Sequence, residues 1–234
     1  MNVLVACEES QRVCIAFREK GHRAFSCDIQ ECSGGHPEWH IQGDVLELLN
    51  PIKYCSSEIQ YYGIRPFCTL DEKKHFIEGK WDMIIAFPPC IYLSNAGAVR
   101  LYKKIDGKSY CELERLNKGF DAKDFFMSFL NADCDKIAIE NPIPSRVYRL
   151  PPYSQIVQPY EHGDPYSKKT CFWLKRLPKL MPSKVVVPIC SWVSGGSKDN
   201  NGIKRENCGM KFRDSKTKSK TFEGIAKAMA DQWG

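Results

Sequence analysis

The first 150 residues alternate short apolar runs with segments of helical periodicity, and this alternation restricts the fold more than any other feature. Apolar runs of strand length occupy residues 3–7, 24–28, 83–87 and 136–140. Apolar residues at helical spacing mark residues 10–20, which end at Gly21, and residues 122–130. Strands that alternate with helices predict an α/β fold with a doubly wound, mostly parallel sheet.

The remaining segments suggest one core with an appendage, which suits a chain of 234 residues. Residues 51–80 read as an insertion and residues 101–119 as a polar loop with a short helix. Three further strands are predicted at 155–158, 170–174 and 185–190, and a final helix at 221–233. We therefore expect a catalytic core of residues 1–180 plus 220–234, with a small basic, β-rich and loop-rich appendage at 181–219.

Unusual polar residues stand where the predicted strands end. They are Cys7-Glu8-Glu9-Ser10, Asp28, Pro88-Pro89-Cys90 and Glu140-Asn141-Pro142. Ligands of open α/β sheets bind beyond the carboxyl ends of the strands. The sequence therefore predicts a ligand site at this edge of the sheet.

The net charge of +6 is concentrated in one segment. Residues 183–220 hold nine basic and three acidic side chains, an excess equal to the whole net charge. A basic segment on a neutral core favours contact with a polyanion such as nucleic acid. A solvated, lysine-rich loop is the alternative interpretation.

Twelve cysteines raise the question of metal or disulfide chemistry. No pair has the two-residue spacing typical of structural zinc sites. The best metal candidate is the set Cys27, Cys32, His36 and His40, but small buried hydrophobic thiols are the favoured interpretation, and no metal is predicted.

No apolar run approaches the roughly 18 residues needed to span a bilayer. The apolar run at residues 3–7 is shorter than a signal-peptide core of about 7–15 residues. We therefore expect a soluble, cytoplasmic protein that makes no contact with a membrane.

Three segments carry the residues that suit catalysis. Two prolines stiffen the approach to Cys90, and a fixed thiol near basic groups can act as a nucleophile; one more buried cysteine is the alternative. Glu140 ends an apolar strand, where desolvation raises a carboxyl pKa and suits it to proton donation; an acid that caps a turn is the alternative. Lys168 and Lys169 enter a strand and suit contact with a phosphate or carbonyl group, or form a plain basic turn.

Together these segments resemble the DNA (cytosine-5) methyltransferases, in particular the compact members carried by phages and prophages. Residues 88–97 are similar to the family motif Pro-Pro-Cys-Gln-x-Phe-Ser-x-Ala-Gly, with Ile91 in place of glutamine. Residues 140–142 are similar to the Glu-Asn-Val turn. Residues 163–170 are similar to Gly-Val-Pro-Gln-x-Arg-x-Arg, with Tyr166 in place of glutamine and Thr170 in place of the second arginine. The resemblance covers about residues 1–175 and 220–234.

The resemblance implies methyl transfer from S-adenosylmethionine to carbon 5 of cytosine, with Cys90 adding to carbon 6. It implies that Glu140 stabilises the adduct at ring nitrogen 3, that Asn141 fixes the turn of the glutamate, and that Lys168 replaces a base-contacting arginine. The target base must be flipped out or single-stranded. The implied cofactor-binding residues are Cys7, Glu8, Glu9, Ser10, Asp28, Ile29, Asp44, Val45, Phe87 and Pro88.

The departures from the family pattern leave alternatives open. The glycines of the family's Phe-x-Gly-x-Gly turn are missing from residues 7–11, which motivates a degenerate relative that only binds nucleic acid or a partner protein. The small recognition segment implies relaxed specificity or a protein partner that supplies it, or the same chemistry on RNA or a free pyrimidine nucleotide. Expected nucleic-acid contacts are Ser94, Lys169, Lys204, Arg205, Lys211, Arg213, Lys216 and Lys218.

Overall fold

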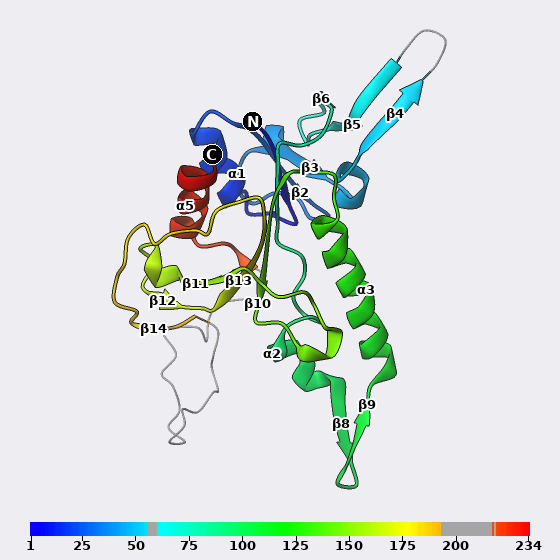
Figure 1. Cartoon of the computed structure of the whole chain (residues 1–234), viewed down its shortest axis with the longest axis vertical. Coiled ribbons are helices and arrows are strands. Elements are labelled where there is room, and N and C mark those ends of the chain that lie inside the picture. Colours follow the sequence, from blue (N-terminus) through cyan, green and yellow to red (C-terminus); the bar gives the residue numbers. More distant parts are fainter. Residues whose placement is uncertain (56–59, 193–216, 218) are drawn as a thin grey trace.

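The computed structural model describes residues 1–55, 60–192, 217 and 219–234, and its centre is a seven-stranded sheet (Figure 1). The strands, in spatial order, are β11 (Gln155–Val157), β13 (Thr170–Lys175), β10 (Lys136–Pro142), β7 (Met83–Ala86), β1 (Asn2–Ala6), β2 (Arg23–Asp28) and β3 (His40–Gln42). The five strands from β10 to β3 are parallel, and only β13 runs against its neighbours. The predicted α/β fold with a doubly wound, mostly parallel sheet is confirmed.

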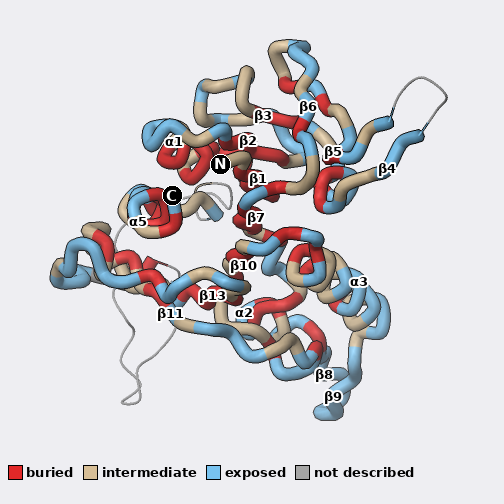
Figure 2. Tube along the Cα trace, turned by 45° about the horizontal axis from the view of Figure 1, so that its top comes forward, coloured by how far each residue is buried: buried red, intermediate tan, exposed pale blue. Residues whose placement is uncertain are grey.

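Helices cover both faces of this sheet (Figures 1 and 2). Helices α1 (Arg12–Glu19) and α5 (Glu223–Trp233) pack on one face, and α3 (Leu113–Leu130) packs on the other. Successive side chains of a strand point to opposite faces, so Val3 and Val5 of β1 join the core under α1 and α5, whereas Leu4 and Ala6 join the core under α3. The sheet therefore has no solvated face along β1.

Smaller elements extend from the core. The predicted insertion forms a three-stranded antiparallel sheet of β4 (Pro51–Cys55), β5 (Gln60–Cys68) and β6 (Lys74–Glu78). After β7 come the short helix α2 (Asn95–Ala98) and the hairpin of β8 (Tyr102–Ile105) and β9 (Lys108–Cys111). Strand β12 (Tyr166–Ser167) pairs with β14 (Cys190–Ser191). Single 3-10 turns occupy Pro37–Trp39, Val45–Leu48, Val99–Leu101, Arg146–Tyr148 and Pro159–Glu161.

Two predicted elements are wrong. The polar stretch 101–119 is not a loop with a short helix, because it forms the β8–β9 hairpin and the first turns of α3. The first half of α3 has few apolar residues, of which Leu113 and Phe120 are 69% and 44% exposed, and it carries a Glu114–Lys118 ion pair on its surface, so its apolar pattern is weaker than that of the second half. The predicted strand 185–190 is almost wholly irregular; its Val185 and Val187 are 69% and 82% exposed, since no sheet face receives them.

No helix in the described part of the chain combines the length and the apolar character needed to cross a membrane.

We predict that Gly119→Ala in α3 destabilises the protein by about 1–3 kcal/mol, because a Cβ atom there would overlap the buried ring of Tyr148. An unobstructed glycine in a helix would instead gain up to about 1 kcal/mol from alanine. Urea unfolding measures the difference. Asn117→Ala, at an exposed position two residues earlier, is the matched control and should be neutral or slightly stabilising. Equal stability of Gly119→Ala and the wild type would contradict this packing.

Candidate active site

The strand order reverses between β1 and β7. From β1 the chain moves outward to β2 and β3, and it then returns to place β7 on the other side of β1, followed by β10. Ligands of open α/β sheets bind at such a switch point, beyond the carboxyl ends of the strands. The turn after β1 contains Cys7 and the turn after β7 contains Cys90, so the sheet brings the predicted strand-end residues to one edge.

The turn that carries Cys90 is tied to the end of β10. The side-chain amide of buried Asn141 donates a hydrogen bond to the carbonyl of Pro88 at 3.1 Å. Further along both loops, the Asn95 amide donates to the Ile143 carbonyl at 2.9 Å and the Ser145 amide donates to the Leu93 carbonyl at 2.7 Å. The two predicted catalytic segments, 88–97 and 140–142, are therefore joined by hydrogen bonds. Cys90 itself is exposed.

Arg115 of α3 fixes the loop after Cys90 from the other side. Its guanidinium donates to the carbonyls of Ile91 at 2.9 Å and Gly97 at 3.1 Å, and lies 4.9 Å from the centre of the Tyr92 ring. The hydroxyl of Ser94 accepts a hydrogen bond from the Gly97 amide at 3.2 Å, and Ser94 is only 5% exposed. Ser94 thus caps α2, and its contact with nucleic acid stays a prediction. No pattern in the sequence had indicated Arg115.

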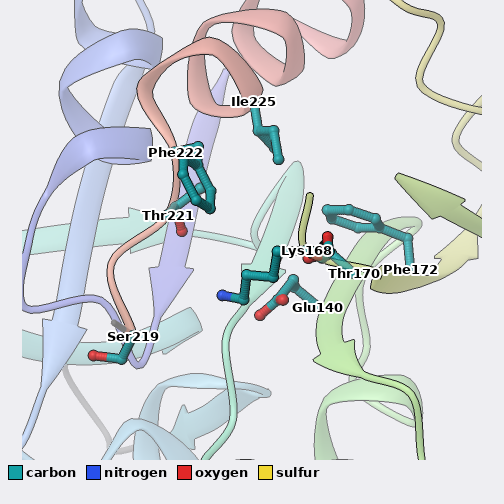
Figure 3. Close-up of a pocket in the computed structure, with 8 residues that line it drawn as sticks. All are labelled: Glu140, Lys168, Thr170, Phe172, Ser219, Thr221, Phe222 and Ile225. Atoms are coloured by element: carbon teal, nitrogen blue, oxygen red, sulfur yellow. Dashed lines mark hydrogen bonds between the residues drawn. The ribbon is translucent and has the colours of Figure 1, made fainter. Parts of the chain in front are cut away.

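A small pocket lies between the end of β10, the start of β13 and the segment that leads into α5 (Figure 3). Its empty volume of about 250 Å³ includes space that is open to solvent, and its lining residues are Glu140, Lys168, Thr170, Phe172, Ser219, Thr221, Phe222 and Ile225. Lys168 extends into it, with its Nζ atom 5.9 Å from the centre of the Phe222 ring. The sequence predicts only Glu140 and Lys168 as catalytic residues here; Phe222 and Ile225 are buried core residues that also line the pocket.

Cys90, Glu140 and Lys168 form one electrostatic unit. Burial raises the pKa of Glu140, and Lys168 followed by the Thr170 hydroxyl opposes the rise. The protein atoms packed around the Cys90 thiol raise its pKa, the Glu140 carboxylate raises it further, and Lys168 lowers it. Cys171 also lies beside Glu140 but is fully buried. Burial and the Glu140 charge raise the pKa of Cys171 to about 11. Of these two thiols beside Glu140, only Cys90 is open to a reactant.

Acidic groups meet beyond the ends of β2 and β3, next to the turn after β1, where the cofactor was predicted. Burial raises the pKa of the Cys7 thiol, and the charges of Asp28 and Asp44 add to the rise. Each aspartate accepts one backbone hydrogen bond at 2.9 Å, from Gln30 to Asp28 and from Leu46 to Asp44. The structure thus places both carboxylates around one point beyond the sheet edge.

Apolar side chains flank these acids. Ile29, directly after Asp28, is 78% exposed, and Leu46, near Asp44, is 41% exposed. Val45 lies in the core instead, at 4% exposure, so the exposed apolar residue beside Asp44 is one that the sequence analysis had missed. Phe87 and Pro88 are half-buried and buried at the end of β7, next to β1.

The turn after β1 keeps a left-handed backbone without glycine. Cys7 and Gln11 have φ angles of 59° and 58°, a region that costs an L-residue roughly 1–2 kcal/mol. The side chain of Gln11 is fully buried and offsets this cost, because its amide bonds the Ser26 hydroxyl at 3.2 Å and both backbone groups of His36, at 2.8 and 3.1 Å. The missing glycines therefore do not remove the turn.

Of the other predicted residues in this turn, Glu8 has a structural task. Its carboxylate accepts hydrogen bonds from the amides of Val13 at 2.7 Å and Cys14 at 3.2 Å, which caps the start of α1. Burial raises the pKa of Glu8 to about 8. Glu9 and Ser10 are buried beside it.

The segment that leads into α5 contacts the turn after β1. The Nζ atom of Lys220 donates to the Ser33 hydroxyl at 2.9 Å and lies 3.9 Å from a carboxylate oxygen of Glu9. The guanidinium of Arg12 donates to the Thr221 carbonyl at 2.6 Å. These contacts join the turn after β1 to the segment that lines the pocket in Figure 3.

The two histidines of the candidate zinc set, His36 and His40, contact other groups. Both ring nitrogens of His40 are hydrogen-bonded, to the Ser26 hydroxyl and to the Gln30 carbonyl, each at 2.9 Å, and His36 stacks on Trp39. The described residues hold no cluster of three or more metal-ligating side chains. The expectation of buried thiols holds for Cys14, Cys27, Cys134 and Cys171, whereas Cys55, Cys68, Cys90 and Cys111 are exposed.

Most of the predicted nucleic-acid contacts lie outside the described residues: Lys204, Arg205, Lys211, Arg213, Lys216 and Lys218. Lys169 is described and exposed, immediately before β13.

Comparison with known proteins gives distant structural similarity. No protein-family model matches the sequence, and no curated protein matches it. A solved structure from E. coli, described as a DNA modification methyltransferase encoded within a prophage, is similar with 14% identity and a TM-score of 0.40, over 82% of this chain and 53% of that one. The methyltransferase EhMeth of Entamoeba histolytica is similar with 12% identity and a TM-score of 0.40, over 85% and 61%. The chain thus spans between half and two thirds of the length of each.

We predict that Glu140→Gln lowers the pKa of the Cys90 thiol and that Lys168→Gln raises it, since each variant removes one of the two charges acting on the sulfur. At about pH 8, where the thiolate fraction limits the reaction, iodoacetamide should modify Cys90 roughly two- to tenfold faster in the first variant and slower in the second. Peptide mass spectrometry gives the rate for each cysteine. Exposed Cys55, Cys68 and Cys111 serve as internal controls. Identical Cys90 rates in all three proteins would contradict the proposed electrostatic unit.

Proposed function

We propose that this chain is an S-adenosylmethionine-dependent DNA (cytosine-5) methyltransferase. The observation that carries the proposal is the arrangement of an exposed thiol, Cys90, under the influence of a half-buried carboxyl group, Glu140, and a cation, Lys168, at the switch point of the sheet. A nucleophile, a proton donor with a raised pKa and a charge-stabilising cation in one place are what addition to a pyrimidine ring requires.

The residues beyond β2 and β3 fit the proposed cofactor. Asp28 and Asp44 provide carboxylate oxygens for the hydroxyl and amino groups of an adenosine, and exposed Ile29 and Leu46 provide apolar surface for its base. S-adenosylmethionine, when bound, supplies the electrophilic methyl group that carbon 5 of the cytosine acquires. The turn after β1 adopts positive φ angles at Cys7 and Gln11 without glycine, which supports the proposal that the turn can serve this half of the site.

The chain's own groups then activate the base. The Cys90 thiolate adds to carbon 6, which forms a sulfur–carbon bond and makes carbon 5 electron-rich. Glu140 donates a proton or a hydrogen bond to ring nitrogen 3; its raised pKa favours the protonated form, and a neutral Glu140 also removes the repulsion that opposes a thiolate at Cys90. Lys168 offsets the negative charge that develops on the adduct. Once carbon 5 carries the methyl group, it loses its proton to a base; the electron pair re-forms the double bond between carbons 5 and 6 and expels the thiolate, and the proton on nitrogen 3 returns to the Glu140 carboxylate.

DNA is the proposed acceptor. Its cytosine must be flipped out or single-stranded, because a base stacked inside a duplex cannot reach a thiol at a sheet edge. We further propose that residues 181–219 are a reduced, basic target-recognition segment, so that sequence specificity is relaxed or comes from a protein partner. The rival interpretation as a degenerate, non-catalytic relative rested on the missing glycines, and the retained left-handed turn weakens that argument.

We predict that Cys90→Ser abolishes 5-methylcytosine formation and that Glu140→Gln lowers its rate by about 10²–10⁴-fold, the range for loss of a general acid. Mass spectrometry of nucleosides from DNA co-expressed with each protein measures the product. Cys68→Ser, which changes another exposed thiol, should keep wild-type activity. Unchanged 5-methylcytosine with Cys90→Ser would rule out the covalent mechanism, and methylated RNA in place of DNA would change the acceptor.

We also predict that Asp28→Ala weakens S-adenosylmethionine binding by roughly ten- to a hundredfold, as expected for loss of hydrogen bonds to a charged acceptor. Isothermal titration calorimetry measures the affinity. Asp124→Ala, at an exposed position of α3, is the matched control. If the wild-type protein releases no heat with the cofactor and is not stabilised by it, the proposed cofactor is wrong.

A further inference from the structure

Lys168, the cation of the candidate site, lies at a break in the strand pairing. It follows β12, which ends at Ser167, and precedes β13, which begins at Thr170. The β11–β13 ladder ends at the pair Val157–Thr170 and the β12–β14 ladder ends at Ser167, so neither of these ladders includes Lys168. A lysine carries its charge on a flexible four-carbon stem, so a charge that acts at a fixed place needs another restraint.

The side chain of Gln158 provides a restraint on the backbone of Lys168. The Oε1 atom of Gln158 accepts a hydrogen bond of 3.0 Å from the backbone amide of Lys168. The carbonyl of Lys168 accepts a second hydrogen bond, of 3.3 Å, from the Thr170 hydroxyl. Side chains therefore hold both backbone groups of Lys168, and its Nζ atom lies 5.9 Å from the centre of the Phe222 ring (Figure 3).

Gln158 is itself held in place by a capping box at the 3-10 turn Pro159–Glu161. Its backbone amide donates to the Glu161 carboxylate at 2.7 Å, and its side chain accepts a hydrogen bond from the Glu161 amide. Shorter side chains, such as those of serine and asparagine, are the usual caps of a helical turn. The longer glutamine bonds two backbone amides with the two lone pairs of one oxygen, one amide in the turn and the other at Lys168.

We propose that Gln158 is a positioning residue that sets the place of the Lys168 charge relative to Cys90 and Glu140. Its part in catalysis rests on the proposed function, whereas its effect on the thiol does not. Lys168 lowers the pKa of the Cys90 thiol and opposes the rise in the pKa of Glu140. Because the energy between two charges falls with distance, a displaced Lys168 weakens both effects.

Alkylation of Cys90 in the full chain tests this role. Gln158→Met keeps the length of the side chain but removes its oxygen, so iodoacetamide should modify Cys90 about two- to fivefold more slowly at about pH 8. Once the lysine charge is removed there is nothing left to position, so Gln158→Met should have no further effect in a Lys168→Gln background. Gln155→Met in β11 is the matched control. It removes the acceptor of a 2.9 Å hydrogen bond from the Leu180 amide and should leave the Cys90 rate unchanged.

The double variant separates positioning from a merely structural role. A structural defect of Gln158→Met acts with or without the lysine charge, so it would slow Cys90 equally in both backgrounds. That result, or an unchanged Cys90 rate in Gln158→Met, would overturn the proposal. Peptide mass spectrometry gives the rates, and urea unfolding confirms that each variant is folded.

Methylation kinetics separate this proposal from the proposed function. Gln158→Met should lower kcat by roughly three- to tenfold, less than complete loss of a charge-stabilising group, and should leave the dissociation constant for S-adenosylmethionine unchanged. A wild-type kcat in this variant would overturn the catalytic part of the proposal. If the wild type methylates no DNA, the proposed function fails, yet a slower Cys90 reaction that depends on Lys168 would still support the positioning role of Gln158.

Discussion

One buried hydrogen bond, from the side-chain amide of Asn141 to the carbonyl of Pro88, sets the relation between the two halves of the candidate site. It joins the end of β10 to the turn after β7, two strands that lie side by side in the sheet. Its loss would leave a fully buried donor without its partner and would cost about 1–3 kcal/mol. Both strands are packed on two faces and are therefore held in place. The bond thus fixes the position of the Cys90 turn relative to Glu140.

That relation makes the protonation of the thiol and the carboxyl group interdependent. The charge of Glu140 raises the pKa of Cys90, and Lys168 lowers the pKa of both groups, so the two acids are coupled by the same cation. In a partly desolvated pocket such coupling is stronger than on an open surface. The rim formed by Phe222 and Ile225 of the α5 segment therefore acts on the chemistry indirectly, by excluding water from Glu140 and Lys168 (Figure 3).

The parts of the site that could be predicted from sequence are those encoded locally. The apolar runs that form β1, β7 and β10 end at Cys7, Cys90 and Glu140, and a parallel sheet must bring such ends to one edge. Arg115 and Thr170 could not be found in this way. Arg115 acts through backbone carbonyls that lie 24 and 18 residues away, and Thr170 gains its place beside Glu140 only because β13 pairs antiparallel with β10. The β8–β9 hairpin escaped prediction since both of its faces are exposed, which removes the alternation that marks a half-buried strand.

The turn after β1 shows that a backbone geometry usually supplied by a glycine motif can form without the glycines. A glycine-rich motif records a requirement for positive φ angles, yet Cys7 and Gln11 adopt such angles here without glycine. The cost is offset by the buried side chain of Gln11, which replaces conformational freedom with hydrogen bonds to Ser26 and to the backbone of His36. Glu8 strengthens the same turn by capping α1, and Lys220 links it to the segment before α5. A backbone held by this network has less freedom to rearrange around a ligand than one built from glycines, so a ligand of this half of the site must fit a turn that is already formed.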